Sequence, residues 1–181
     1  MKKSHLRKKL IKKRKLKFRE NLSIDFKKIL SLINKKKMKS KNIVGGYYPV
    51  NYEIDDINIL DRFEKKGFKI SLPKIKKKFQ MDFFKFSGND ILKVNKYGIP
   101  EPLSRKKVLP DILLVPIVGF DKNLNRIGYG AGYYDRAIAK IKKRKKVLTI
   151  GLAYHFQEVK FIPINKYDYK LDFIVTDKKV F

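Results

Sequence analysis

Cysteine is absent from the 181 residues, and this absence excludes a disulfide framework and thiolate chemistry. A chain without cysteine suits a reducing compartment, so we expect a cytoplasmic protein. Long apolar runs are missing as well. No stretch reaches membrane-spanning length, and the basic start MKKSHLRKKLIKKRKLKF never continues into the apolar segment of a signal peptide. We therefore expect no membrane partner.

Acidic residues are scarce, because 17 Asp and Glu stand against 46 Lys and Arg, and the net charge is +29. Residues 1–41 hold 18 of the basic residues and only Glu20 and Asp25 as acids, so +16 lies in this segment. One interpretation is an electrostatic footprint for nucleic acid or another polyanion. The other is a lysine-rich composition that forms solvated surface, since basic runs recur at 76–78 and 142–146. We favour the second interpretation.

Apolar patterns and turn residues indicate alternating helices and strands. The chain is long enough to bury one core, and we expect a single domain over residues 1–181 with a very basic helical segment at 1–41. Helices are predicted at 4–19, 23–38, 57–66 and 133–146, and strands at 41–50, 68–75, 81–86, 112–120, 147–154 and 171–177. Asp55 or Asp56 can cap the third helix, and Gly67 can end it.

Glycine and proline residues between 89 and 110 predict a loop with one helical turn. The run ILLVPIVGF at 112–120 is continuously apolar, which is typical of a strand buried on both faces of a sheet. Together with the alternation of helices and strands, this run predicts a three-layer α/β domain with a mainly parallel sheet flanked by helices.

The stretch RIGYGAGYYDRAI, at 126–138, places a glycine-rich loop directly before a predicted helix. Free N–H groups and the helix dipole at such a junction suit a phosphate group. The loop lacks the Gly-Lys-Ser/Thr of a Walker A motif, and its spacing does not fit the dinucleotide fingerprint. On spacing alone the loop is a weak signal for a phosphate site, and the alternative is a tight glycine turn with packed tyrosines.

Asp135 falls in the first turn of the predicted helix, where a carboxylate stabilises the positive end of the helix dipole. Beside bound phosphates the same carboxylate would suit Mg²⁺, which prefers one or two carboxylates together with phosphate oxygens. A second carboxylate could come from Asp168 or Asp172, and the spacing does not choose between these two residues.

Residues 111–136, DILLVPIVGFDKNLNRIGYGAGYYDR, resemble the signature of the 5-formyltetrahydrofolate cyclo-ligase family, also called methenyltetrahydrofolate synthetases. Other segments resemble the family in the same order: Lys3 to Arg7, 47–55, 66–75, 97–102, 151–159 and 167–177. An ordered set over nearly the whole chain is far more specific than one glycine loop. The resemblance implies an architecture like that of sugar-phosphate isomerases and coenzyme A transferases.

The resemblance also implies an activity, namely the closure of 5-formyltetrahydrofolate to 5,10-methenyltetrahydrofolate. ATP and Mg²⁺ are required, the formyl oxygen is phosphorylated, and ADP and phosphate are released. Phosphoryl transfer depends mostly on positioning and charge neutralisation, so no nucleophilic Ser, Cys or His is needed. We therefore assign no catalytic nucleophile or base.

By resemblance, the basic N-terminus and the glycine loop bind ATP. The matching residues are Lys3, Arg7, Arg126, Ile127, Gly128, Tyr129, Gly130, Ala131, Gly132, Tyr133 and Tyr134. Lys3 and Arg7 are four residues apart and share one helix face, where cations can pair with phosphates. Asp135 and Asp168 match the positions that bind Mg²⁺ in the family. Ala131 is a departure, because many relatives have glycine or a basic residue there.

The folate substrate, with or without a polyglutamate tail, is expected to meet a second set of residues. This set comprises Tyr48, Glu53, Glu101, Tyr129, Gly130, Ala131, Gly132 and Tyr133. Glu53 could accept hydrogen bonds from the amino and ring N–H groups of the pterin, whereas Tyr48 stands where leucine is commoner. We expect the aromatic residues of MDFFKF to belong to the core and His155 to lie at the rim of the site.

Two other functions remain as alternatives. A basic RNA- or ribosome-associated protein would explain the charge, although the chain has no RRM aromatic signature, KH-type loop or zinc ligands. A sugar-phosphate isomerase or acyl transferase would share the α/β architecture, because fold does not fix function. We expect a monomer that binds small molecules.

Overall fold

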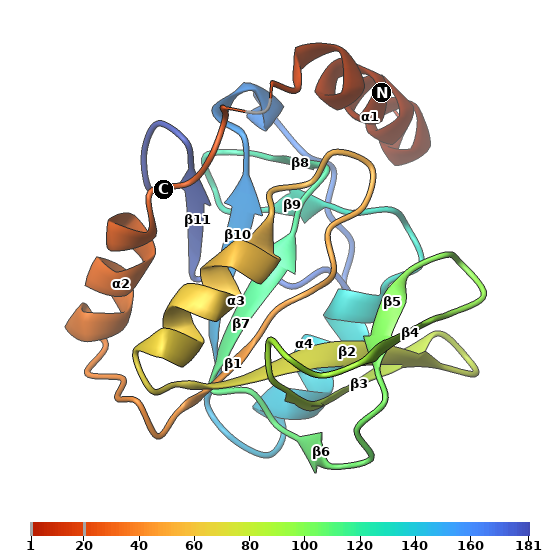
Figure 1. The fold of residues 1–181 in the computed structure, drawn as a ribbon. Coiled ribbons are helices and arrows are strands. Elements are labelled where there is room, and N and C mark those ends of the chain that lie inside the picture. Colours follow the sequence, from red (N-terminus) through yellow and green to blue (C-terminus); the bar gives the residue numbers. More distant parts are fainter. Residues whose placement is uncertain (1, 20) are drawn as a thin grey trace.

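The computed structural model describes residues 2–19 and 21–181, and its centre is a seven-stranded sheet (Figure 1). The strand order is β11-β10-β7-β1-β2-β3-β6. From β11 to β2 all neighbours are parallel, and β3 and β6 then pair antiparallel. The strands are β1 Ile43–Gly45, β2 Lys69–Lys76, β3 Gln80–Phe86, β6 Lys107–Val108, β7 Ile112–Pro116, β10 Leu148–Ala153 and β11 Phe173–Thr176.

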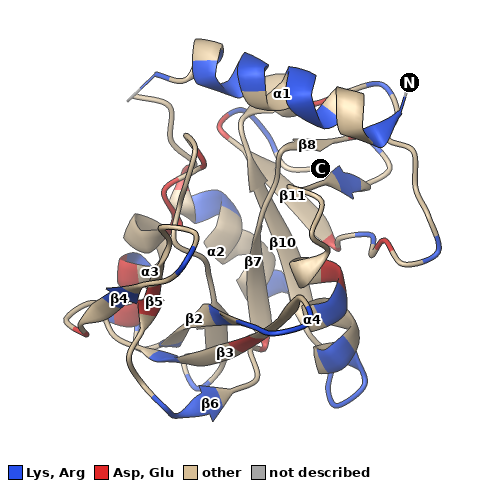
Figure 2. Cartoon of the chain, turned by 90° about the vertical axis from the view of Figure 1, so that its right-hand side faces the viewer, with Lys and Arg blue, Asp and Glu red and all other residues tan. Residues whose placement is uncertain are grey.

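Helices cover both faces of this sheet. Figure 2 shows α2 and α3 on one side and α4 on the other, with α1 across the upper end. The helices are α1 Lys3–Lys17, α2 Phe26–Lys35, α3 Asp56–Lys65 and α4 Tyr133–Lys142. The predicted three-layer α/β class with a mainly parallel sheet is confirmed. None of the helices in residues 2–19 and 21–181 has the length and apolarity to cross a membrane.

The alternation of side chains along β7 explains why two layers of helices are needed. Ile112 and Leu114 belong to the apolar cluster that includes α2 and α3, whereas Leu113 and Val115 belong to the cluster that includes α4. All four side chains are fully buried. Successive residues of a strand point to opposite faces, so a continuous apolar run must be covered on both sides.

The predicted helix boundaries follow local capping chemistry. Asp55 caps α3 by accepting a hydrogen bond from the Asn58 amide at 3.2 Å, which settles the choice between Asp55 and Asp56. Gly67, with a φ of 84°, takes the left-handed conformation just after this helix. Asp25 caps α2 in the same way through the Lys27 amide, so α2 begins three residues later than predicted.

Two predictions about the strands are wrong. Residues 89–110 contain the hairpin of β4 Leu92–Val94 and β5 Pro100–Pro102, followed by β6, in place of a loop with a helical turn. Asn95 makes this hairpin possible, because its side chain accepts from the amides at both ends of the turn. The run 112–120 is not one strand, since Pro116 has no N–H to continue the ladder. The chain turns there into β8 Gly119–Phe120, which pairs with β9 Arg126–Ile127.

Candidate active site

The candidate active site lies at the carboxyl ends of the parallel strands, where α/β proteins commonly bind ligands. Side-chain contacts join four segments there: α1, the segment 46–55 after β1, the loop 128–132 before α4, and residues 165–169. Arg14 of α1 donates to the Ile117 carbonyl after β7 and to the Tyr129 hydroxyl. The Tyr154 hydroxyl, after β10, donates to the Glu53 carbonyl at 3.4 Å. Figure 1 shows α1 lying across this end of the sheet.

The glycine loop depends on conformations that other residues rarely adopt. Gly130 has a φ of 105°, and Gly132, the N-cap of α4, has a φ of 66°. A Cβ atom at Gly130 would lie 3.0 Å from Cζ of Arg7. Arg7 in turn donates from Nε to the Gly128 carbonyl at 2.6 Å. The Arg7 guanidinium therefore contacts the glycine backbone directly before α4.

Both predicted cations of α1 face this end of the molecule. While Arg7 contacts the loop, Lys3 donates to Asp168 Oδ2 at 2.5 Å. The expected sharing of one helix face is therefore confirmed. A third cation stands on the other side of the loop, because Arg136 donates to the carbonyl of Ala131. Arg136 was not among the predicted site residues, and it places a positive charge beside the position where Ala131 departs from the family.

The carboxylates predicted to hold a metal lie in adjoining segments. Asp135 Oδ1 accepts from Arg126 at 2.6 Å and from the Tyr169 amide at 3.1 Å, so the residue after Asp168 touches Asp135. Asp172 lies elsewhere, because its Oδ2 accepts from the amide and hydroxyl of Thr149 on β10. Of the two candidates for the second carboxylate, Asp168 is the neighbour of Asp135.

The donor set fits Mg²⁺ rather than an ion held by protein alone. All the hydrogen bonds to Asp135 go to Oδ1 and all those to Asp168 go to Oδ2, so each carboxylate keeps one oxygen without a partner among residues 2–19 and 21–181. Within the same residues, no group of three or more His, Cys, Asp or Glu side chains could hold a metal. Mg²⁺ commonly takes one or two carboxylates and completes its shell with phosphate oxygens and water.

Beneath the loop lies a cluster of buried polar atoms without hydrogen bonds. Glu53 Oε1, Asp56 Oδ1, the Tyr134 hydroxyl and Arg14 Nε are buried and have no partner in the described part of the chain. Buried polar groups in folded proteins are nearly always hydrogen-bonded, and each unpaired group costs about 1–3 kcal/mol. Four such atoms on interacting residues make this cluster a candidate site for a polar ligand.

Burial also changes the ionisation of these groups. It raises the pKa of Glu53 to about 7, although a hydrogen bond from the Val50 amide and the charge of Arg14 act to lower it. Burial, together with the charge of Glu53, raises the pKa of Asp56 well above its usual range. Asp56 is fully buried, and its Oδ2 accepts from the Tyr47 amide at 2.7 Å. The cluster therefore holds two carboxyl groups that gain protons more readily than free ones.

Two other predicted folate residues are Tyr48, next to Tyr47 after β1, and Glu101, on the β4–β5 hairpin. Tyr48 is half-buried beside Tyr47, and no hydrogen bond of its side chain is found in the described residues. Glu101, on β5, accepts from the Ile75 amide and from the Asn95 side chain, both at 2.8 Å, so it ties the β4–β5 hairpin to β2. Its charge also acts on Tyr133 of the glycine loop. The hairpin therefore lies next to the loop.

The aromatic segment MDFFKF lies largely in the core, as expected. Met81, Phe83 and Phe86 are buried in the two apolar clusters. Phe84 is half-buried, and the Lys74 ammonium lies 4.5 Å from its ring centroid.

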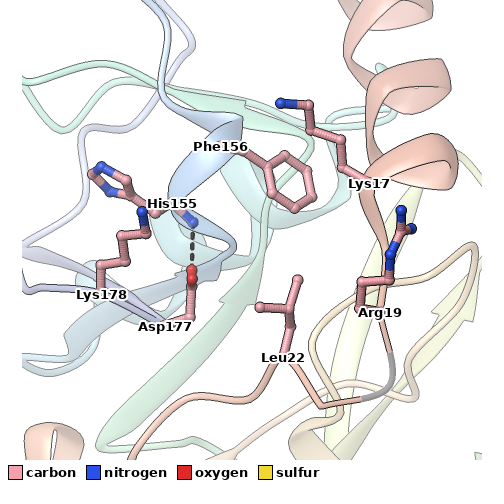
Figure 3. A pocket seen from close by; sticks show the side chains of 7 residues that line it. All are labelled: Lys17, Arg19, Leu22, His155, Phe156, Asp177 and Lys178. Carbon is pink, nitrogen blue, oxygen red and sulfur yellow. Dashed lines mark hydrogen bonds between the residues drawn. The ribbon is translucent and has the colours of Figure 1, made fainter.

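A pocket of about 410 Å³ adjoins the far end of α1 (Figure 3). It is lined by Lys17, Arg19, Leu22, His155, Phe156, Asp177 and Lys178. The His155 amide donates to Asp177 Oδ1 at 2.6 Å, and the imidazole stacks on Phe181. Phe156 stacks on Tyr154, whose hydroxyl reaches the Glu53 carbonyl. His155 thus lines this pocket and follows Tyr154 in the chain, and its position at the rim of the substrate site stays a prediction.

Arg14 and Asp56 are parts of this site that the sequence analysis missed. A signal for Arg14 was present, because Lys3, Leu6, Leu10 and Arg14 recur at the spacing of one helix face. Asp56 was considered only as a helix cap. One cation within an apolar stripe is easily overlooked in a segment where lysine occupies nearly every other position.

The fold and the site together define a class of α/β enzyme with a cationic glycine loop and a buried carboxyl group at the carboxyl edge of a mainly parallel sheet. Comparison with known proteins makes the class specific. The chain belongs to the 5-formyltetrahydrofolate cyclo-ligase family, whose model matches residues 1–177. It is therefore an enzyme of this family, a ligase of folate metabolism, and the resemblance found in the sequence is confirmed.

Individual relatives support the same assignment. The chain is 32% identical over 149 residues to the 5-formyltetrahydrofolate cyclo-ligase of Haemophilus influenzae, covering 78% of each protein. The Escherichia coli enzyme of the same name is 29% identical over 144 residues, covering 76% of this chain and 79% of that one. The structure of 5,10-methenyltetrahydrofolate synthetase from Aquifex aeolicus superposes with a TM-score of 0.79 at 32% identity, covering 99% of this chain and 92% of that one.

Proposed function

We propose that this protein closes 5-formyltetrahydrofolate to 5,10-methenyltetrahydrofolate at the expense of ATP, with Mg²⁺. In the proposed reaction, the formyl oxygen attacks the γ-phosphorus and ADP leaves. The N10 amine of the folate then attacks the activated carbon. The C–O bond breaks, phosphate departs with the formyl oxygen, and N10 loses its proton. Charge and atoms balance without a protein nucleophile.

The observation that carries this proposal is the buried carboxyl group of Glu53 beneath a cationic loop. Its free Oε1 offers an acceptor in a place from which water is excluded. A pterin presents adjacent amino and ring N–H donors that such a carboxylate can accept. A site built to hydrogen-bond these donors would reject ligands that lack them, because its own polar atoms would stay unpaired.

The loop and α1 have the chemistry for the phosphates. Arg7 lies against backbone that glycine leaves open, Arg126 pairs with Asp135 at the positive end of the α4 dipole, and Lys3 pairs with Asp168. Such groups stabilise the charge that spreads over the transferred phosphoryl group. Asp135 and Asp168 would hold Mg²⁺, which neutralises phosphate charge when it is bound.

The direct test is an assay of the purified protein with 5-formyltetrahydrofolate and Mg-ATP, followed by the absorbance of the methenyl product. We expect turnover that requires both ATP and Mg²⁺. A folded protein that gives no product even at stoichiometric enzyme concentration would contradict the proposal. Strong, salt-sensitive RNA binding by the same inactive sample would instead favour the nucleic-acid alternative.

Asp135→Asn tests the metal role. We expect turnover to fall by about a hundredfold, because the neutral amide holds Mg²⁺ poorly where phosphate charge develops. The thermal midpoint should change little, since the amide oxygen can still accept from Arg126 and Tyr169. Asp172→Asn is the comparison, because this residue binds β10 instead. Equal turnover of Asp135→Asn and the unaltered enzyme would remove Asp135 from the metal site.

A further inference from the structure

Arg14 is buried in a way that is unusual for a cation. Its side chain is 1% exposed, and arginine is almost never buried to that extent without a paired acid. Among residues 2–19 and 21–181 it forms no ion pair. Its hydrogen bonds go to the Ile117 carbonyl at 3.1 Å and to the Tyr129 hydroxyl, and its Nε has no partner. A charge in such a position needs a reason beyond packing.

Glu53 is the counterpart of Arg14. It is 8% exposed, and its Oε1 is also without a hydrogen-bond partner in the part of the chain that the structure describes. The charge of Arg14 acts on Glu53, yet no hydrogen bond joins the two side chains. Each of the two opposite charges thus keeps a buried polar atom that a bound ligand could pair with. Both groups lie at the proposed folate subsite.

We propose that Arg14 is a positioning residue of the folate subsite: its buried guanidinium is the positive counterpart of the Glu53 carboxyl group and ties Tyr129 of the glycine loop to the end of β7. This inference rests on the proposed function, because it assigns Glu53 to the folate. It adds a role for α1 that is separate from the phosphate contacts of Lys3 and Arg7. Helix α1 would therefore position both the phosphate site, through Lys3 and Arg7, and the folate subsite, through Arg14.

The surroundings of Glu53 show why one cation matters so much. The titratable and charged groups that face it are Arg14 from α1, Tyr47 after β1, Asp56 from α3, Tyr129 from the loop, Tyr134 from α4 and Tyr154 after β10. Arg14 supplies the positive charge in this set. Without it, burial would favour the protonated form of Glu53 more strongly, and this form accepts hydrogen bonds from a pterin less well.

The test is the pH dependence of 5-formyltetrahydrofolate binding, measured by titration calorimetry without ATP between pH 6 and pH 9. For the unaltered enzyme the Kd should fall as the pH rises through about 7, where Glu53 loses its proton. In Arg14→Met the pKa of Glu53 rises, so the whole transition should move upward by about one pH unit. Near pH 7 the Kd should be about fivefold higher in Arg14→Met, and at high pH it should approach that of the unaltered enzyme.

Three further variants separate charge from structure. Arg14→Lys keeps the charge and should keep the transition in place. Lys15→Met removes one exposed positive charge from the same helix and should leave both Kd and the transition unchanged. Glu53→Gln should bind weakly at every pH, without a transition near 7. Thermal unfolding of each variant checks that it is folded. If Arg14→Met does not fold, Arg14→Lys and Glu53→Gln still test whether the transition belongs to Glu53 and depends on the charge at position 14.

Several results would overturn the inference. These are a Kd weakened equally at every pH in Arg14→Met, a transition displaced in Arg14→Lys, or a transition that persists in Glu53→Gln. The absence of a transition near pH 7 in the unaltered enzyme would overturn it as well. Because binding is measured without ATP, a protein that binds folate but does not cyclise it would contradict the proposed reaction while leaving the role of Arg14 intact.

Discussion

Gly130 and Gly132 bring the backbone of the loop into conformations that place Arg7 and the start of α4 next to each other. The φ angle of 105° at Gly130 is strained for any residue with a side chain. A Cβ at Gly130 would lie only 3.0 Å from Cζ of the Arg7 guanidinium. Open backbone and cation together make the proposed phosphate site, so a single methyl group should disturb both.

Gly130→Ala should raise the KM for ATP by about tenfold and the KM for the folate by less, because the displaced Arg7 belongs to the proposed phosphate contacts. The added Cβ costs about 1–3 kcal/mol of backbone strain and pushes Arg7 away from the Gly128 carbonyl. Steady-state kinetics with each substrate varied in turn measure the effect. Gly128→Ala is the matched comparison, because open space surrounds its position, and it should raise the KM for ATP less. Equal effects of the two variants would contradict this account of the loop.

Among the elements, β3 is held to its neighbours by one buried carboxylate. Asp82 is 4% exposed and meets Lys76 of β2 at 2.9 Å, Lys107 of β6 at 2.9 Å and Lys140 of α4 at 2.5 Å. Burial acts to raise the pKa of Asp82, but hydrogen bonds from the three ammonium groups hold it well below its usual range. The antiparallel edge of the sheet is thereby tied to α4, the helix that begins at the glycine loop.

Asp82→Asn should lower the free energy of unfolding by about 2 kcal/mol at neutral pH, because charged hydrogen bonds are lost. The pKa of Asp82 is depressed in the folded state. Its contribution is therefore full above the unfolded pKa of about 3.9 and is lost as the pH falls below that value. Denaturant unfolding at pH 7 and below pH 4 should show the difference between the two proteins shrinking in acid.

Asp61→Asn is the control for this experiment, since the pair of Asp61 with Lys65 is exposed on α3. Exposed ion pairs contribute little to stability, so Asp61→Asn should lower the free energy of unfolding by only about 0–1 kcal/mol. A difference for Asp82→Asn that grows on acidification would show that Asp82 is not stabilised as a carboxylate.

Local signals in the sequence were sufficient for most elements. The continuous apolar run at 112–120 predicted a doubly buried strand, of which 112–116 forms β7, and a cap at Asp55 or Asp56 together with Gly67 predicted the ends of α3. The hairpin at 92–102 was missed because proline normally argues against strands, whereas here a short hairpin outside the main sheet tolerates it. For the site, motif matching identified Glu53 and the loop, but the charge environment of Glu53 depends on contacts between residues far apart in the chain.

For the whole molecule, the positive charge is distributed rather than gathered at the site. Figure 2 shows Lys and Arg on α1, on α4 and on β6. Several lysines pair with the few acids, as Lys145 does with Asp111 at 2.6 Å, and others lie over aromatic rings. This distribution favours the interpretation of a lysine-rich surface over that of a single footprint for a polyanion. A surface of this kind would still attract the anionic substrates of the proposed reaction.

The central claim is that cyclisation of the folate consumes ATP stoichiometrically at this site. Methenyltetrahydrofolate, ADP and phosphate should be quantified in one initial-rate reaction that contains only the purified enzyme and its substrates. A parallel reaction without the folate is the control. We predict one ADP and one phosphate for each methenyl product, with negligible ADP in the sample without folate. Product formed without ADP, or ADP released at the same rate with and without the folate, would contradict the claim.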